Sequence, residues 1–198
     1  MKIAKIVRSN SHVDYVGRVI DVLDSTNPPA ATDYGFGQFV MMPLEDMTEV
    51  VGVIYDSQLL NPDYGSYGPR LSPQPELAVL SPDYLNEQGL LVGILLLGWR
   101  DRLKNEIWHG VPRAIVPVNQ DVFRLADEDF LEFHNDGNGK IRLHYYAQIL
   151  AHANEFGSFL LEKILAQLSP LCCDEDKKRL QVLKTSLTWQ RTLGNNKH

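Results

Sequence analysis

The chain has 198 residues, of which 44% are hydrophobic and 22% are charged, a composition typical of a globular protein with a core of its own. Its formal net charge of −6 disfavours nucleic acid as the main ligand, because a surface that binds phosphates is normally basic. The longest apolar run, 90–97, is far shorter than the about 20 residues of a membrane-spanning helix. We therefore expect one domain plus an appendage and no membrane segment.

The first residues and the cysteines both predict a cytoplasmic protein. Residues 1–8 alternate basic and apolar side chains and lack the long apolar segment and cleavage site of a signal peptide. The two cysteines, Cys172 and Cys173, are adjacent, and neighbours form only a strained disulfide. Reduced thiols in a reducing compartment are therefore expected. The chain has no CxxC pair, so nothing indicates a thioredoxin-like or zinc-knuckle role.

Residues 15–125 are predicted to be rich in β-strands. Alternating or β-branched apolar residues predict strands at 15–23, 37–43, 49–56, 90–97 and 121–125, with shorter pieces at 111–112 and 115–118. The Gly and Pro turns between them are typical of a sandwich or barrel, and glycines 35 and 37 fit a bulge or a barrel corner. The stretch 61–75 has no periodicity and predicts a long loop, functional or disordered.

From residue 127 the pattern becomes helical. A short helix is expected at 127–133, a turn at 135–140, and a long helix at 144–168, where apolar residues recur in steps of three and four. A second long helix is expected from Asp174, with Leu180, Leu183 and Leu187 on one stripe. The predicted fold is therefore a small closed β-barrel over 1–126 followed by a C-terminal helical hairpin over 127–198, α+β overall.

The last 25 residues differ from the rest in charge. Residues 174–198 carry six basic side chains against three acidic ones, whereas the whole chain is acidic. Such asymmetry could serve self-association or a partner with an acidic face, and a solvated amphipathic helix is the alternative interpretation.

No residue pattern marks a catalytic or metal site. The six histidines do not form HExxH or i,i+4 pairs, and His144 and His152 would lie about 12 Å apart along a helix, too far for one zinc ion. They are interpreted as exposed or capping side chains. The turn at 135–140 lacks the GxxxxGK[ST] spacing of a phosphate loop, and no GxSxG motif occurs. We therefore predict no catalytic residue, no metal and no cofactor, and the chain is not expected to be an enzyme.

Three residues are candidates for contact with a ligand. Asp56 follows a predicted strand, where sites often lie, although a turn-forming role is the simpler explanation. Tyr34 and Tyr55 belong to a set of aromatic residues near the glycine-rich loops, which also includes Phe36, Tyr64 and Tyr67. These rings could stack on a base or a flavin, or could pack the loops onto the barrel.

The predicted strands resemble the barrel at the N-terminus of HerA-type hexameric ATPases, which is related to the N-terminal barrel of rotary ATP synthase subunits. The resemblance covers about 15–125 and rests on Gly17-Arg18-Val19-Ile20, Gly37-Gln38-Phe39-Val40, Val50-Val51-Gly52-Val53-Ile54-Tyr55-Asp56, Gly93-Ile94-Leu95-Leu96-Leu97-Gly98, Gly110-Val111-Pro112 and Val122-Phe123-Arg124-Leu125. In that family the barrel packs subunits side by side and a separate domain hydrolyses ATP. This chain lacks the P-loop and has no room for an ATPase core after residue 125, so the resemblance implies a stand-alone barrel that assembles or docks.

These observations leave three functional hypotheses. The leading one is a non-catalytic assembly or adaptor module, with a homo-oligomer or a HerA-type ATPase as the protein partner. The second is a barrel that binds a small, flavin-like molecule, with or without enzymatic activity. The third is single-stranded nucleic-acid binding by an OB-like barrel, which the acidic β-rich part disfavours.

Overall fold

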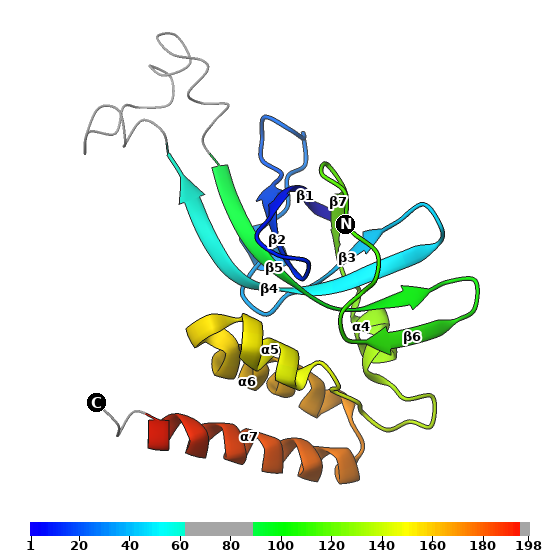
Figure 1. Ribbon diagram of the computed structural model, residues 1–198, viewed down its shortest axis with the longest axis vertical. Helices are drawn as coiled ribbons and strands as arrows, with labels where there is room; N and C mark the ends of the chain where they lie inside the picture. Colours follow the sequence, from blue (N-terminus) through cyan, green and yellow to red (C-terminus); the bar gives the residue numbers. More distant parts are fainter. Residues whose placement is uncertain (62–88, 195–198) are drawn as a thin grey trace.

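The computed structural model describes residues 1–61 and 89–194 and contains a closed barrel (Figure 1). The strands are β1 Lys2–Ser9, β2 Asp14–Val19, β3 Phe39–Pro43, β4 Thr48–Leu60, β5 Gly89–Asp101, β6 Glu106–His109 and β7 Asp121–Arg124. They form one sheet in the order β2-β1-β7-β3-β4-β5-β6, and a further antiparallel pairing of β2 with β5 closes the ring. Strand β6 lies outside the ring, on β5. The predicted barrel with C-terminal helices is confirmed.

Among the described residues, two strands were not predicted, and the two short pieces predicted at 111–112 and 115–118 are not strands. Strand β1 pairs with β2 and β7, so the sheet begins at residue 2 rather than 15. Strand β6 pairs with the end of β5 and stacks Trp108 on Trp99 at 5.5 Å between ring centroids. The segment 111–118 is not part of the sheet, because Pro112 and Pro117 offer no N–H to a ladder.

The barrel interior is filled with side chains. Ile94 and Leu95 are adjacent on β5 and point to opposite faces of the sheet, and both are fully buried in one core that also contains helix residues. The strands β4 and β5 are 13 residues long and pair along their whole length, with irregularities at Val51/Gly52 and Ile54/Asp56. Such bulges bend a strand, which lets the long ribbon curve around the barrel and continue beyond it.

The helical part contains α4 Asp127–His134, α5 Tyr146–His152, α6 Gly157–Leu168 and α7 Asp174–Gly194, with short 3-10 turns η1 Ala31–Asp33, η2 Asn154–Phe156 and η3 Ser169–Leu171. The single helix expected at 144–168 is wrong, because the chain reverses at Asn154, whose φ is 49°. Asparagine tolerates this left-handed conformation, which an α-helix cannot contain. The reversal lets α5 and α6 lie side by side against the barrel. The helix expected from Asp174 is confirmed.

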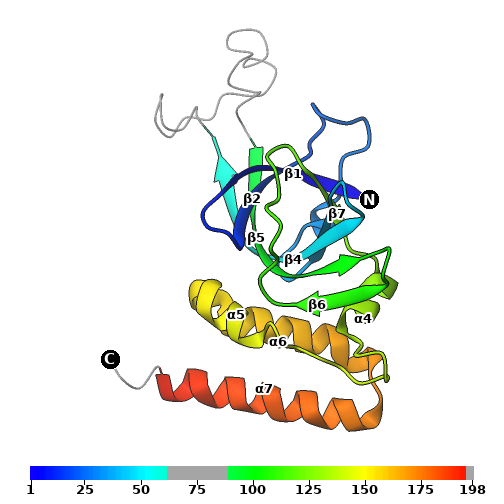
Figure 2. The same cartoon turned by 45° about the vertical axis from the view of Figure 1, so that its right-hand side comes forward.

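The helices form two layers below one end of the barrel. Helices α5 and α6 lie next to the barrel, and α7 lies beyond α6, farthest from the strands (Figures 1 and 2). Leu160, Ile164 and Leu168 of α6 are fully buried in the same core as the barrel residues. None of the described helices combines the length and the apolar character required to cross a membrane.

Candidate binding sites at the barrel–helix junction and on the last helix

A bulge in β4 explains why two neighbouring residues contribute to the same site. Ile54 pairs with Ile94 and Asp56 pairs with Gly93, so Tyr55 is the extra residue of the bulge. In a regular strand, successive side chains point to opposite faces. The bulge breaks this alternation, and both Tyr55 and Asp56 line one cavity.

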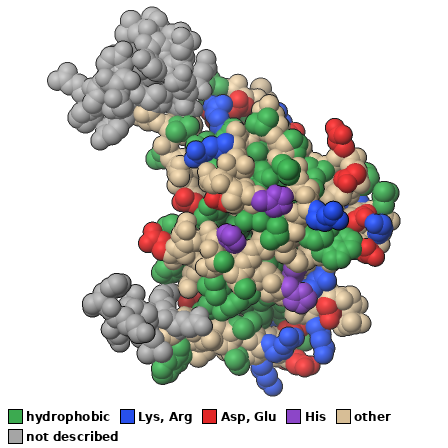
Figure 3. Space-filling view, in the orientation of Figure 1, with side chains coloured by type: hydrophobic (Ala, Val, Ile, Leu, Met, Phe, Trp, Pro, Cys, Tyr) green, Lys and Arg blue, Asp and Glu red, His purple; other side chains and the backbone are tan. Residues whose placement is uncertain are grey.

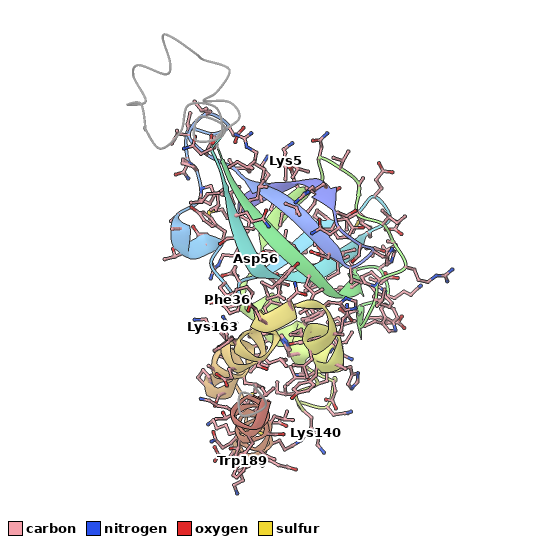
Figure 4. All side chains as sticks on the ribbon, turned by 60° about the vertical axis from the view of Figure 1, so that its left-hand side comes forward. Lys5, Phe36, Asp56, Lys140, Lys163 and Trp189 are labelled. Carbon is pink, nitrogen blue, oxygen red and sulfur yellow. The ribbon has the colours of Figure 1, made fainter. Side chains whose placement is uncertain are left out.

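The cavity lies where the barrel meets the helices and has a volume of about 300 Å³. Its lining comes from the η1 loop, β4, β5 and the turn between α5 and α6: Ala31, Tyr34, Gly35, Phe36, Ile54, Tyr55, Asp56, Ser57, Leu90 and Phe156. Figure 4 shows Asp56 and Phe36 near each other at this junction. The volume is at the low end for ligand pockets, so the cavity suits a small organic group.

The loop that carries Tyr34 and Phe36 is fixed by a glycine. Gly37 has φ 82°, and a Cβ there would lie 2.7 Å from Cγ of Lys163 on α6. Its N–H donates to the carbonyl of Ile54 at 2.8 Å, and its own carbonyl accepts from the Gln167 amide at 3.4 Å. The glycine therefore lets the loop lie directly against α6.

The charges beside the cavity are negative. The Tyr55 hydroxyl donates to Asp14 at 2.8 Å, and the Asp56 carboxylate accepts the Ser57 N–H at 2.8 Å. Burial raises the pKa of Tyr55, and the hydrogen bond to Asp14 and the charges of Asp14 and Asp56 raise it further. The phenol therefore stays protonated and acts as a fixed donor.

The three predicted ligand residues, Tyr34, Tyr55 and Asp56, thus lie together around one cavity. Tyr64 and Tyr67 lie outside the described residues, as does most of the predicted loop 61–75. The sequence interpretation missed Phe156, because its helical periodicity indicated a core position. In the structure it is 40% exposed and meets Phe36 edge to face at 6.1 Å between centroids.

His134 is fully buried and His109 is half-buried beside it, contrary to the prediction of exposed or capping side chains. His134 donates from Nδ1 to the Phe130 carbonyl at 2.7 Å, while Nε2 accepts from the Tyr145 hydroxyl. His109 donates from Nε2 to the Phe133 carbonyl at 2.8 Å.

Burial keeps both rings neutral, lowering the pKa of His109 to about 4 and that of His134 to about 3. The other described histidines, His12, His144 and His152, are exposed, as expected. Histidine side chains also reach the face seen in Figure 3.

The remaining chemistry-bearing groups have structural partners. Cys172 and Cys173 are free thiols, and burial raises the pKa of Cys172, which donates to the Leu168 carbonyl at 2.9 Å. The turn at 135–140 is held by Asn135 and Asp136, whose side-chain oxygens accept backbone N–H groups. Within the described part of the chain, no three His, Cys, Asp or Glu side chains are grouped to hold a metal ion.

A larger hollow of about 730 Å³ lies between β6 and α4. Glu132 lines this hollow and already forms an ion pair with Arg100 at 2.8 Å. Trp108 also lines the hollow and stacks on Trp99. These two lining residues therefore already have structural partners.

Helix α7 has apolar residues on two opposite faces. The inner face buries Leu180 and Leu187 against α6, as predicted. We call the opposite stripe, formed by Lys178, Val182, Thr185 and Trp189, the outer face of α7. Val182 is 69% and Trp189 64% exposed, and Figure 4 places Trp189 at the end of the molecule away from the barrel. Lys and Arg side chains gather at this end (Figure 3).

A family model described as a domain of unknown function, DUF8166, matches residues 1–195. No curated protein matches the chain.

Proposed function

The chain belongs to this DUF8166 family, and we propose that it is a non-catalytic assembly module whose copies associate through the outer face of α7. The observation that carries the proposal is the exposure of Val182 and Trp189 on one line of a helix whose other side is already buried. Tryptophan is enriched at protein interfaces, and an exposed apolar stripe on a helix is a common docking surface.

The spacing of the outer face fits a second copy of the same helix. The four residues follow steps of four, three and four, which is the spacing of a helix–helix seam. In an antiparallel pair with its two-fold axis between Leu183 and Lys184, Lys178 faces the partner's Trp189, and Val182 faces the partner's Thr185. An ammonium group above an indole ring gains about 0.5–1 kcal/mol at an exposed site. The stripe is therefore complementary to itself, as a two-fold interface requires.

Other features support a role without catalysis. The barrel interior is filled by apolar side chains, which leaves its surface as the part available to other molecules. The two histidines of lowered pKa each engage a backbone carbonyl, and His134 is also fully buried, which fits a structural role for both rings.

The resemblance to HerA-type barrels suggests a second way in which the chain could act as an assembly module, which is docking to a partner ATPase. A barrel-to-barrel contact would use the segment 111–118, which lies along the barrel and exposes Val111, Ile115 and Val118. Co-purification with an ATPase would support this form of the proposal.

Sedimentation velocity at increasing protein concentration tests self-association. We expect a concentration-dependent dimer or larger oligomer for the natural chain and a monomer for Val182→Lys. Leu103→Lys is the matched control. Like Val182, Leu103 is an exposed aliphatic side chain (76% exposed), but it lies in the β5–β6 turn, away from α7. A natural chain that stays monomeric at high concentration, or a Val182→Lys variant that associates normally, contradicts the proposal.

A cysteine pair tests the register. In a background without Cys172 and Cys173, the Val182→Cys and Thr185→Cys variants are mixed and oxidised. We expect the mixed disulfide dimer to form faster than a dimer of Val182→Cys with an exposed Leu103→Cys variant. Equal rates contradict the antiparallel register.

A further inference from the structure

The aromatic walls of the cavity at the barrel–helix junction are open to a ligand. Phe36 and Phe156 are each 40% exposed although phenylalanine is usually buried, and their rings meet edge to face. Tyr34 and Tyr55 complete the aromatic lining. Edge-to-face contact leaves ring faces available, and a ring face carries partial negative charge.

The charged side chain in the cavity lining, Asp56, is negative, as are the faces of the aromatic rings. Asp56 lies in the cavity wall, and among the described residues no basic side chain forms an ion pair with its carboxylate. By contrast, Asp21, Glu49, Asp121 and Asp129 are each paired with a lysine or arginine. A second carboxylate, Asp14, accepts the hydroxyl of Tyr55, one of the lining residues. The cavity therefore combines aromatic faces with negative charge and favours a cation over an anion.

We propose that this cavity binds an alkylammonium group, either of a small free amine or of a lysine side chain of another protein. A soft cation with apolar methyl or methylene groups gains contact with the rings and charge attraction from the carboxylate together, and aromatic cages for methylated ammonium groups work on this basis. The volume of about 300 Å³ matches such a group and not a large cofactor. The inference concerns a different surface from the outer face of α7 and does not depend on self-association.

An NMR titration with choline tests the proposal, with 3,3-dimethyl-1-butanol as the uncharged probe of the same shape. We expect saturable shifts of the aromatic signals of Tyr34, Phe36 and Phe156 with choline, and at least about tenfold weaker binding of the alcohol. Absence of saturation at tens of millimolar choline, or equal binding of the alcohol, overturns the proposal.

Substitutions locate the site. Asp56→Asn keeps an oxygen for the Ser57 N–H and should weaken choline binding by about tenfold, which corresponds to about 1.4 kcal/mol. Phe156→Ala should weaken it to a similar extent, and Glu155→Gln, an exposed neighbour outside the lining, should leave it unchanged. Unaltered binding by Asp56→Asn and Phe156→Ala overturns the assignment of this cavity.

Two further probes distinguish the source of the cation. A blocked trimethyllysine peptide that binds more tightly than choline assigns the site to a protein side chain, whereas equal or weaker binding assigns it to a free amine. The monomeric Val182→Lys variant should bind choline as the natural chain does, so a failure of the self-association proposal does not affect this one.

Discussion

His134 ties the helical part of the molecule to the barrel. Its ring lies 5.3 Å from that of Phe39 at the start of β3 and accepts the hydroxyl of Tyr145 just before α5. Nδ1 donates to a carbonyl and Nε2 accepts from a hydroxyl, and only the neutral imidazole has one donor and one acceptor. Burial is the largest cause of the lowered pKa of His134, and positive charge on the neighbouring His109 or Arg142 lowers it further.

Acid should therefore destabilise the fold through His109 and His134. Both pKa values lie below the ordinary 6.5, so the unfolded chain binds more protons than the folded one once the pH falls below about 6.5. The contribution is fully present above pH 6.5 and is lost as the pH falls to about 4, where His109 begins to titrate in the folded state. Each histidine should lower the free energy of unfolding by about 1.4 kcal/mol per pH unit in this range.

Urea denaturation between pH 7 and pH 4.5 measures this slope. His134→Phe should be less stable at pH 7, because Tyr145 loses its acceptor. Its unfolding free energy should, however, fall less steeply with decreasing pH, by about 1.4 kcal/mol per pH unit, because one shifted histidine is gone. His152→Gln, which alters an exposed ring, should keep the full slope. A slope unchanged in His134→Phe contradicts the assignment.

Helix α4 is attached to the sheet by a buried arginine. Arg100 on β5 is 2% exposed and lies within 2.7 Å of Glu49 on β4 and of Asp129 on α4, and within 2.8 Å of Glu132. Asp129 and Glu132 are three apart on α4 and so face the same way. The guanidinium thereby joins two strands and a helix, and its removal would leave carboxylates facing one another.

We expect Arg100→Met to cost about 3 kcal/mol of unfolding free energy, the low end for a broken buried ion pair. The carboxylates lose their buried cation and keep only the partly exposed Arg102, which pairs with Glu49 at 2.8 Å and with Asp129 at 3.8 Å. Lys104→Met is the control: Lys104 pairs with Asp101 at 3.2 Å but is 68% exposed, so its loss should cost less than about 1 kcal/mol. Adding Glu49→Gln to Arg100→Met should recover part of the loss in urea denaturation. Similar stability of Arg100→Met and Lys104→Met would falsify this account.

At the scale of elements, the sequence pattern correctly predicted those helices and strands whose limits depend on local residues. Helix α7 begins at the predicted Asp174 and buries the predicted leucine stripe. The reversal at Asn154 was missed because the apolar periodicity continues through it, so nothing in the pattern separates α5 from α6. Strand β1 was missed because its alternation is short and ends in exposed residues.

Across the whole molecule, barrel and helices share one hydrophobic core. Phe39 of the barrel meets Phe130, His134 and Tyr145 at ring-centroid distances of 4.9, 5.3 and 6.4 Å. The Gln148 side chain of α5 donates to the Leu96 carbonyl of β5 at 2.6 Å. The helices therefore close one end of the barrel, and we expect the predicted division at 126/127 not to be a boundary between independently folding units.

Unfolding should accordingly be a single cooperative transition. In a Trp189→Phe background, fluorescence reports on the barrel through Trp99 and Trp108, while far-ultraviolet circular dichroism reports mainly on the helices. The two urea curves should coincide. A fragment of residues 1–126 should not fold, because it exposes Phe39 and its neighbours. Separate transitions, or a folded fragment, contradict the shared core.

The sequence alone determined the class of the fold and the position of the last helix, because periodicity, turn formers and strand ends are local properties of a chain; it also nominated Tyr34, Tyr55 and Asp56 as candidate ligand residues, which stays a prediction. Only the tertiary structure decided that these three residues share a cavity with Phe156, that His134 is buried, and that one face of α7 remains open. These facts depend on a bulge, on a helix reversal and on which surfaces meet across the chain, and residues distant in sequence contribute to each of them.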